Sequence, residues 1–231
     1  RRAPRETMSP LTSTEIRDMY TPLPIPRRSA FKSLLDKKFE DLKHGIDEDS
    51  YLAFSGVTRS RFQDLETHRD SLGAQHVRLT YFPDIETLIL KVPSEPHEKA
   101  HMAVGNAIRD QLRINMGVAF QEVMMIQSTK YYGRGETIKE SDTSCKNVRL
   151  RSRVGDWPNW VIEGGMAASI QRLRGDASWW INHSRGEVQL VILVWIRPSR
   201  KTIMIETWVP ERSILPPGPR TRARAAIPPV W

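Results

Sequence analysis

Apolar residues follow a helical period in the first third of the chain and an alternating period after it. From Ser29 to Lys43 they recur at the three- and four-residue spacing of one helical face, and a weaker helical pattern runs from about Thr58 to Ser71. Apolar and polar residues then alternate from His76 to Phe82 and from Glu86 to Val92. This part of the chain therefore predicts a helical N-terminal extension followed by a β-hairpin.

The pattern after the hairpin predicts two more helices and five more strands. A long helix is expected from Ser94 or Glu95 to about Asn115, where Gly117 ends it, and another from Ala168 to Asn182. The expected strands cover residues 118–126, 137–145, 159–163, 188–196 and 202–208. This order of elements predicts an α/β (α+β) fold with a mixed β-sheet flanked by helices. The order is a hairpin, a helix, three strands, a helix and two strands.

These elements divide the chain into four segments. Residues 1–26 are expected to form a basic, proline-rich arm, residues 27–75 the helical N-terminal extension, residues 76–212 the α/β domain, and residues 213–231 a basic tail rich in proline and arginine. The alternating prolines of residues 21–26 fix φ and remove backbone donors, which excludes a helix there. The arginines of both ends suit contacts with phosphate, although a solvated tail explains them equally well.

The chain is strongly basic, with a formal net charge of +8 and a sequence pI of about 9.8. Lysine and arginine side chains that neutralise phosphates release counterions, so nucleic acid is the favoured partner. The alternative is a soluble protein whose basic residues only face water. The sequence does not determine the oligomeric state, and a homodimer remains open.

The single cysteine, Cys145, excludes an internal disulfide and predicts a reducing compartment. No apolar run is long enough to cross a bilayer, so no membrane partner is expected. The basic N-terminus lacks the apolar region of a secretory signal. We therefore expect an intracellular protein of the nucleus or the cytoplasm.

Two acidic residues stand beside predicted strands. Glu163 ends the apolar strand of residues 159–163, and Asp142 lies just before a loop. A carboxylate there is costly to bury unless it is paired or holds a cation, and two such groups would suit Mg²⁺ or Mn²⁺. The alternatives are a turn residue for Asp142 and, for Glu163, a structural ion pair with Arg174 or Lys139.

The start of the long helix carries further candidate ligands. His97 and His101 share one helical face and resemble half of a zinc site, but the sequence offers no evident third ligand, so a metal is not expected on them. Glu98 either supports a metal or simply favours the helix N-terminus, where an anion meets the helix dipole.

An ordered set of short motifs between Pro93 and Trp208 carries a resemblance to a known family. The motifs are Pro96-His97-Glu98 with His101, Glu140-Ser141-Asp142, residues 157–163, residues 173–180, and the strands of residues 188–195 and 203–208. In this order they resemble the PD-(D/E)XK nuclease-like domain of fungal proteins, which is similar to bacterial restriction endonucleases. The resemblance implies a restriction-endonuclease-like core and phosphodiester hydrolysis with Mg²⁺ or Mn²⁺ held by Asp142, Glu163 and Glu98.

The sequence departs from the family pattern at two positions. Ser141 stands where the family has proline, and Gly165 stands where it has a lysine two residues after the second acid. The resemblance implies that Arg172 or Arg174 of the following helix supplies the missing cation. An arginine stabilises a charged phosphate but does not readily shuttle a proton, because its pKa exceeds about 12. The alternative function is therefore a catalytically degenerate nuclease fold that serves as a nucleic-acid-binding or protein-interaction module.

The predicted nucleic-acid contacts lie in two loops. The basic loop after Cys145 provides Lys146, Arg149, Arg151 and Arg153, and the expected hairpin turn of residues 133–135 provides Arg134. Trp157 is either packed or stacked on a base. Trp179 and Trp180, on a predicted helix, are expected in the core.

Overall fold

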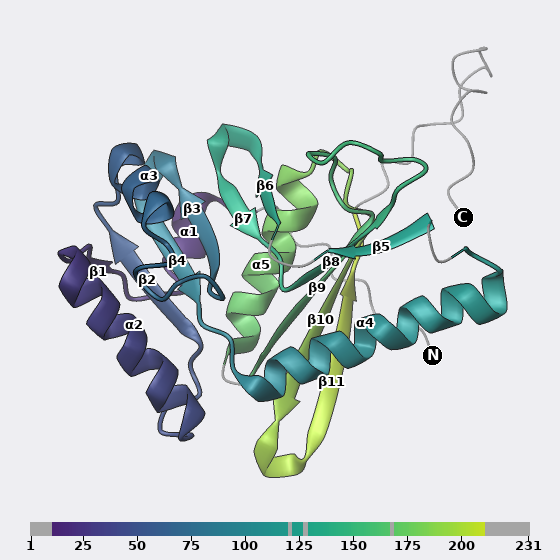
Figure 1. Cartoon of the computed structure of the whole chain (residues 1–231), viewed down its shortest axis with the longest axis horizontal. Coiled ribbons are helices and arrows are strands. Elements are labelled where there is room, and N and C mark those ends of the chain that lie inside the picture. The colour runs from purple at the N-terminus through teal and green to yellow at the C-terminus, as the bar shows by residue number, and fades with distance from the viewer. Residues whose placement is uncertain (1–10, 120–121, 127–128, 167–168, 211–231) are drawn as a thin grey trace.

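The computed structural model of the chain describes residues 11–119, 122–126, 129–166 and 169–210. The basic residues predicted to form terminal contacts, within 1–10 and 211–231, lie outside the described residues. The fold is mixed α and β, with two mixed sheets and helices packed against them (Figure 1).

The six-stranded sheet has the strand order β1-β2-β4-β3-β7-β6. Only its first pair is parallel, and the other neighbours are antiparallel. Its strands are β1 (Leu23–Pro24), β2 (Tyr51–Ser55), β3 (Arg78–Phe82), β4 (Thr87–Lys91), β6 (Lys130–Tyr132) and β7 (Ile138–Glu140). Helices α2 (Arg28–Lys43) and α3 (Arg59–Thr67) cover one face, where Phe31 packs on Phe54 and Phe62 stacks on Tyr81.

The five-stranded sheet has the strand order β11-β10-β9-β8-β5. Its strands are β5 (Val123–Ile126), β8 (Thr143–Asn147), β9 (Trp160–Met166), β10 (Leu190–Arg197) and β11 (Thr202–Trp208). Strands β9 and β10 are parallel, and the other neighbours are antiparallel. A parallel pair needs a crossover, which here is α5 (Ile170–His183).

Successive residues of a strand point to opposite faces, and β9 uses both of them. Ile162 packs toward α4 (Glu95–Met116) with Ala100, whereas Val161 packs toward α5 with Leu173 and Trp180. The same α5 cluster includes residues of the six-stranded sheet, among them Tyr51, Phe82 and Ile89. Helix α5 therefore lies between the two sheets, and α4 covers the far face of the five-stranded sheet (Figure 1).

The predicted helices and most predicted strands are confirmed within about two residues at most ends. Helices α2, α4 and α5, the β3–β4 hairpin and the β10–β11 pair all occur, and Gly117 ends α4 with a left-handed φ of 65°. The turn of residues 133–135 does join an antiparallel pair, β6 and β7. Trp179 and Trp180 are buried, as expected.

Three expectations about the strands and the extension are wrong. The segment of residues 137–145 is not one strand, because it breaks at Ser141 and Asp142 into β7 and β8, which belong to different sheets. The predicted strands do not form one mixed sheet, because the hairpin of residues 76–92 lies in the six-stranded sheet with β6 and β7, whereas β5 and β8 to β11 form the five-stranded sheet. The segment of residues 27–75 is not helical throughout, since it contains β2.

The described part of the proline-rich arm packs on the molecule. It contains a short helix α1 (Ser13–Arg17) and strand β1, and Ile16 and Tyr20 enter the core beside α5. Among the described residues, no helix is both long and apolar enough to cross a lipid bilayer.

Candidate metal centre

The two predicted acids meet at a lysine that the sequence did not single out. Asp142 lies where the chain passes from β7 to β8, and Glu163 lies inside β9. Lys91, the last residue of β4, places Nζ 2.5 Å from Asp142 Oδ2 and 3.0 Å from Glu163 Oε2. All three residues are at most 5% exposed. A strand of the six-stranded sheet thus supplies the cation for an acid inside the five-stranded sheet, Glu163, and for one at the junction of the two sheets, Asp142.

A wider buried network surrounds Glu163. Trp180 Nε1 donates to its Oε1 at 2.7 Å, and Lys139 Nζ lies 3.9 Å from the same oxygen. Lys139 also donates to Asp176 Oδ1 at 2.6 Å, and Tyr51 donates to Asp176 Oδ2 at 3.0 Å. Of the two ion-pair partners considered for Glu163 from the sequence, the structure therefore brings Lys139 near it.

The network shifts the pKa values of its members in opposite directions. Burial raises the pKa of Glu163 to about 7, because it disfavours the charged carboxylate more than the lysines favour it. Burial also opposes ionisation of Asp142, but the charges of Lys91, His97 and His101 hold its pKa well below the usual range. Burial works against the Lys91 ammonium, yet Asp142 and Glu163 raise its pKa above the ordinary value. Lys91 is therefore a fixed positive charge.

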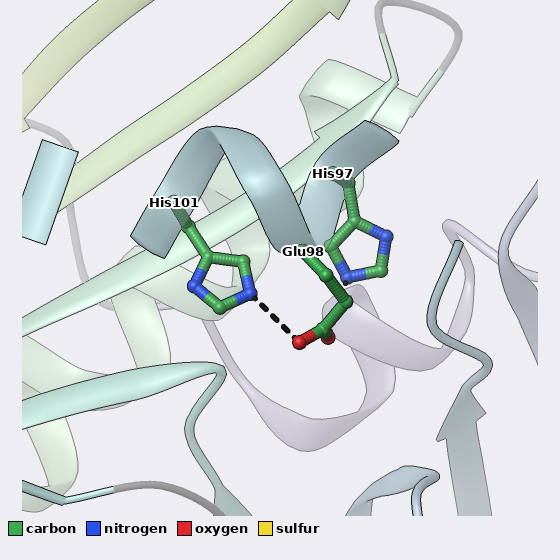
Figure 2. Close-up of side chains that lie close together, drawn as sticks. All are labelled: His97, Glu98 and His101. Carbon is green, nitrogen blue, oxygen red and sulfur yellow. Dashed lines mark ion pairs between the residues drawn. The ribbon is translucent and has the colours of Figure 1, made fainter. Parts of the chain in front are cut away.

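A second cluster lies on the first turns of α4, next to the acids. Figure 2 shows Glu98 between the imidazoles of His97 and His101. His97 Nε2 lies 3.3 Å from Glu98 Oε1, and His101 Nε2 lies 3.3 Å from Glu98 Oε2. Both histidines are buried, whereas the Glu98 side chain is 29% exposed. One ligand atom from each residue can be chosen so that all three lie within 4.8 Å of one another. Glu98 thus lies where a third ligand of the histidine pair would lie, which the spacing of the two histidines did not reveal.

Gly164 connects this cluster to Asp142. Its backbone N–H donates to Asp142 Oδ2 at 2.8 Å. A Cβ at Gly164 would lie 3.2 Å from Cδ2 of His101 and 3.3 Å from Cδ2 of His97, so both rings pack directly on this glycine. Asp142 therefore borders the two imidazoles, although it comes from a different element.

Four buried atoms at this place make no hydrogen bond within the part of the chain that the structure describes. They are His97 Nε2, Glu98 Oε1, His101 Nε2 and Asp142 Oδ1. Buried polar atoms normally have a partner, and atoms without one often mark the position of a water or an ion. Burial tends to raise the pKa of Glu98, but interactions with His101 and His97 lower it to about 2, so this ligand is a carboxylate.

The predicted arginines do not reach the acid pair. Arg172 pairs with Asp49 and donates to the backbone oxygen of Met19 at 3.1 Å. Arg174 pairs with Glu206 of β11, with Nη2 2.9 Å from Oε2. The residue between them, Leu173, is the one that points into the core. The cation in contact with both acids is Lys91.

Position 165 has no room for the lysine of the family pattern. A Cβ on Gly165 would lie 2.9 Å from Leu173 Cδ1 and 3.0 Å from Ser169 Oγ. Helix α5 packs this closely on β9, and the glycine permits the approach. Lys91 lies 51 residues before Asp142. It belongs to the six-stranded sheet, whereas Glu163 belongs to the five-stranded sheet, so no local spacing could have identified Lys91.

Much of the predicted basic loop is engaged in local contacts. Lys146 is buried and donates to the backbone oxygen of Arg153 at 2.5 Å, while Arg149 pairs with Glu122. Arg151 donates to the backbone oxygens of Trp157 and Pro158 at 2.8 and 3.0 Å and pairs with Glu187 at 3.2 Å. The side chain of Arg153 is exposed.

The structure brings two other predicted contact residues, Arg134 and Trp157, to one open pocket. Its volume is about 390 Å³, and it is lined by Tyr132, Gly133, Arg134, Trp157, His183, Ser184, Arg185 and Glu187. Trp157 stacks on Tyr131 with ring centroids 5.4 Å apart, so its placement is fixed by packing. Tyr132 is 67% exposed and Arg134 is exposed.

The chain matches no protein-family model and none of the curated proteins.

Proposed function

We propose that this chain is a metal-dependent nuclease-like protein that hydrolyses phosphodiester bonds of nucleic acid on a restriction-endonuclease-like core. The core would consist of α4, the five-stranded sheet and α5. The observation that carries the proposal is the contact of Lys91 with both Asp142 and Glu163, beside Glu98. This set combines two acids, an accessory acid and a lysine, even though Gly165 removes the lysine from its usual place in the sequence.

The donor atoms fit a divalent cation at the acid end of this set. Asp142 Oδ1 and Glu98 Oε1 are buried and make no hydrogen bond among the described residues, and carboxylate oxygens are ligands of Mg²⁺ and Mn²⁺. A bound divalent cation polarises a phosphodiester and lowers the pKa of a water. Lys91, as a fixed ammonium, would stabilise the negative charge that develops on the phosphate. Glu163, held by Lys91 and Trp180, would keep Lys91 oriented toward the cation.

The charge and the open pocket support nucleic acid as the substrate. The chain carries a net charge of +8, and Arg134 and Arg185 are exposed at the pocket beside Tyr132. Arginines can neutralise phosphates while an exposed aromatic ring stacks on a base, which is the usual combination in single-strand binding.

The test is cleavage of plasmid DNA and of single-stranded DNA and RNA in Mg²⁺ and in Mn²⁺. Wild type is compared with Lys91→Met and Asp142→Asn, and with Lys201→Met as a matched control, since Lys201 is exposed between β10 and β11. We expect cleavage by wild type and the control, and a loss on the order of 100-fold or more in the other two. Equal cleavage by all four proteins would refute the proposal.

A second candidate function, a nucleic-acid-binding module without turnover, is favoured by one observation. Lys91, Asp142 and Glu163 are nearly inaccessible and already paired with one another. A closed network of this kind suits a structural core as well as a reaction centre. This alternative predicts salt-dependent affinity, with log K falling as log salt rises, and no cleavage. Absence of affinity even at low salt would instead favour a protein-interaction domain.

A further inference from the structure

We infer that His97, Glu98 and His101 form a binding site for a transition-metal ion, of the class of Zn²⁺, Co²⁺ or Mn²⁺ rather than Mg²⁺. This inference deepens the proposed function and rests on it for the role of the metal, because Glu98 Oε1 and Asp142 Oδ1 are also the oxygens proposed to hold the cation there. It narrows that cation to a transition metal, and binding is measured without nucleic acid, so its failure is distinguishable from a failure of cleavage. Imidazole nitrogen favours transition metals, whereas Mg²⁺ prefers oxygen ligands and retained waters.

The spacing of the three side chains is that of ligands around one ion. Each imidazole Nε2 lies 3.3 Å from a Glu98 oxygen. Metal–ligand bonds of about 2.0–2.2 Å in a tetrahedral arrangement place neighbouring ligand atoms roughly 3.3 Å apart. None of the contacts to Glu98 Oε1 or to the two Nε2 atoms has hydrogen-bond geometry. These contacts, and that of Arg78 Nη2 at 3.8 Å from Glu98 Oε1, are ion pairs, and they leave both Nε2 atoms and Oε1 free of a hydrogen bond among the described residues.

Asp142 is the candidate fourth ligand. Its Oδ1 is unpartnered among the described residues and fully buried, while its Oδ2 is held by Lys91 and by the Gly164 N–H. The packing of both imidazoles on Gly164 brings this carboxylate alongside them. The ligand atoms of His97, Glu98 and His101 lie within 4.8 Å of one another, a set that does not include Asp142. A cation held by them would give a partner to three of the four unpartnered atoms, and coordination by Asp142 would require its Oδ1 to move closer.

The outer nitrogen of His101 has a partner that suits metal coordination by Nε2, whereas that of His97 accepts a backbone N–H. His101 Nδ1 lies 2.9 Å from Thr143 Oγ1, which can accept its proton. His97 Nδ1 lies 3.2 Å from Ser94 Oγ and 3.0 Å from the Ser94 backbone N–H. The N–H contact corresponds to a ring protonated on Nε2, so coordination by Nε2 would move that proton to Nδ1, remove the hydrogen bond from the Ser94 N–H and leave Ser94 Oγ as the acceptor.

The experiment titrates the full chain, freed of metal by a chelator, with Zn²⁺, Co²⁺ and Mg²⁺ in separate calorimetric runs without nucleic acid. We expect one Zn²⁺ or Co²⁺ per chain, bound on the order of 100-fold more tightly than Mg²⁺. Bound Co²⁺ should show the visible absorption of nitrogen and oxygen coordination. Binding of Mg²⁺ as tight as that of Zn²⁺, or no binding of Zn²⁺, would overturn the inference.

Variants locate the site. His97→Gln combined with His101→Gln should lower Zn²⁺ affinity on the order of 100-fold, whereas the surface pair His44→Gln with His68→Gln should leave it unchanged. Equal affinity in both double variants would place the ion elsewhere and refute the assignment. If circular dichroism shows that the first double variant does not fold, Glu98→Gln replaces it, because that side chain is partly exposed. Unchanged affinity in Glu98→Gln would then refute the assignment.

Discussion

Gly164 and Gly165 follow Glu163 in the same strand, and each leaves room for a different neighbour. Gly164 lies against the imidazoles of α4, and Gly165 lies against Leu173 of α5. Because successive residues of a strand face opposite sides, the two glycines serve the two faces of β9. A methyl group added at each position should therefore disturb different properties of the protein.

We expect Gly164→Ala to weaken Zn²⁺ binding by about tenfold, because the new Cβ would press on both rings and shift their Nε2 atoms. Gly165→Ala should leave Zn²⁺ affinity nearly unchanged but lower the free energy of unfolding by about 1–3 kcal/mol through overpacking against Leu173 and Ser169. Calorimetry and urea denaturation of both variants measure the two effects. The same loss of metal affinity in both would contradict this division of roles.

Lys91→Met should lower the free energy of unfolding by about 3–5 kcal/mol, because two buried acids lose their shared cation. Adding Asp142→Asn to this variant should restore part of the stability, since one of the uncompensated charges is then removed. Urea denaturation of the two single variants and the double variant gives the coupling energy directly. Additive effects would mean that Lys91 and Asp142 do not interact.

The buried imidazole of His183 predicts a pH dependence of stability at a place outside the candidate metal site. Its ring stacks on Trp179 with ring centroids 5.0 Å apart, and burial lowers the pKa of His183 below the ordinary value of 6.5. The folded state therefore binds this proton less readily than the unfolded chain, so the contribution of His183 is complete above about pH 6.5 and is lost as the pH falls below it. In His183→Gln, the free energy of unfolding should fall less steeply between about pH 6.5 and about pH 5 than in wild type. An unchanged slope would contradict this role.

At the scale of elements, the sequence pattern predicts the long amphipathic helices. It does not predict strand β2 or the break between β7 and β8, which depend on how the two sheets divide the strands. Helices α2 and α4 have a clear helical period, so pattern alone located them. Strand β2 has no clear alternation because it is largely buried, and the break between β7 and β8 carries no glycine or proline to mark it.

The candidate site, like the fold, could be predicted only in part from the sequence. Asp142, Glu163 and Glu98 could be found from their positions beside predicted elements, but their partner Lys91 could not be found from spacing. One signal was present: Lys91 stands in the apolar run of residues 88–92, and a charged residue in a buried strand is almost always paired. Arg172 and Arg174, which were expected to supply the cation, are closer to Glu163 in sequence than Lys91 is. They flank Leu173, whose side chain points into the core, and so they point away from the acids.

At the scale of the whole molecule, the proposed function predicts that the arginines of the open pocket neutralise phosphates of nucleic acid. Arg134→Ala with Arg185→Ala should weaken binding of a fluorescent single-stranded oligonucleotide and reduce the slope of log K against log salt by about 0.7 for each phosphate that is no longer neutralised. Arg200→Ala, at the exposed turn between β10 and β11, is the matched control and should not change the slope. Equal slopes in all proteins would exclude the pocket as a place where phosphate binds.

Helix α5 lies between the two sheets, so its core cluster is closed by residues from both. The motifs that carry the nuclease resemblance begin at Pro93, downstream of β2, β3, β4 and Lys91. A fragment of residues 93–210 would keep every one of those motifs and still expose one side of α5 to water, with Glu163 and Asp142 deprived of their lysine. We expect such a fragment to be insoluble or unfolded by circular dichroism, while residues 11–210 fold cooperatively. That result would make the smallest independently folding unit larger than the stretch that carries the resemblance, because the lysine that neutralises the two acids lies outside this stretch.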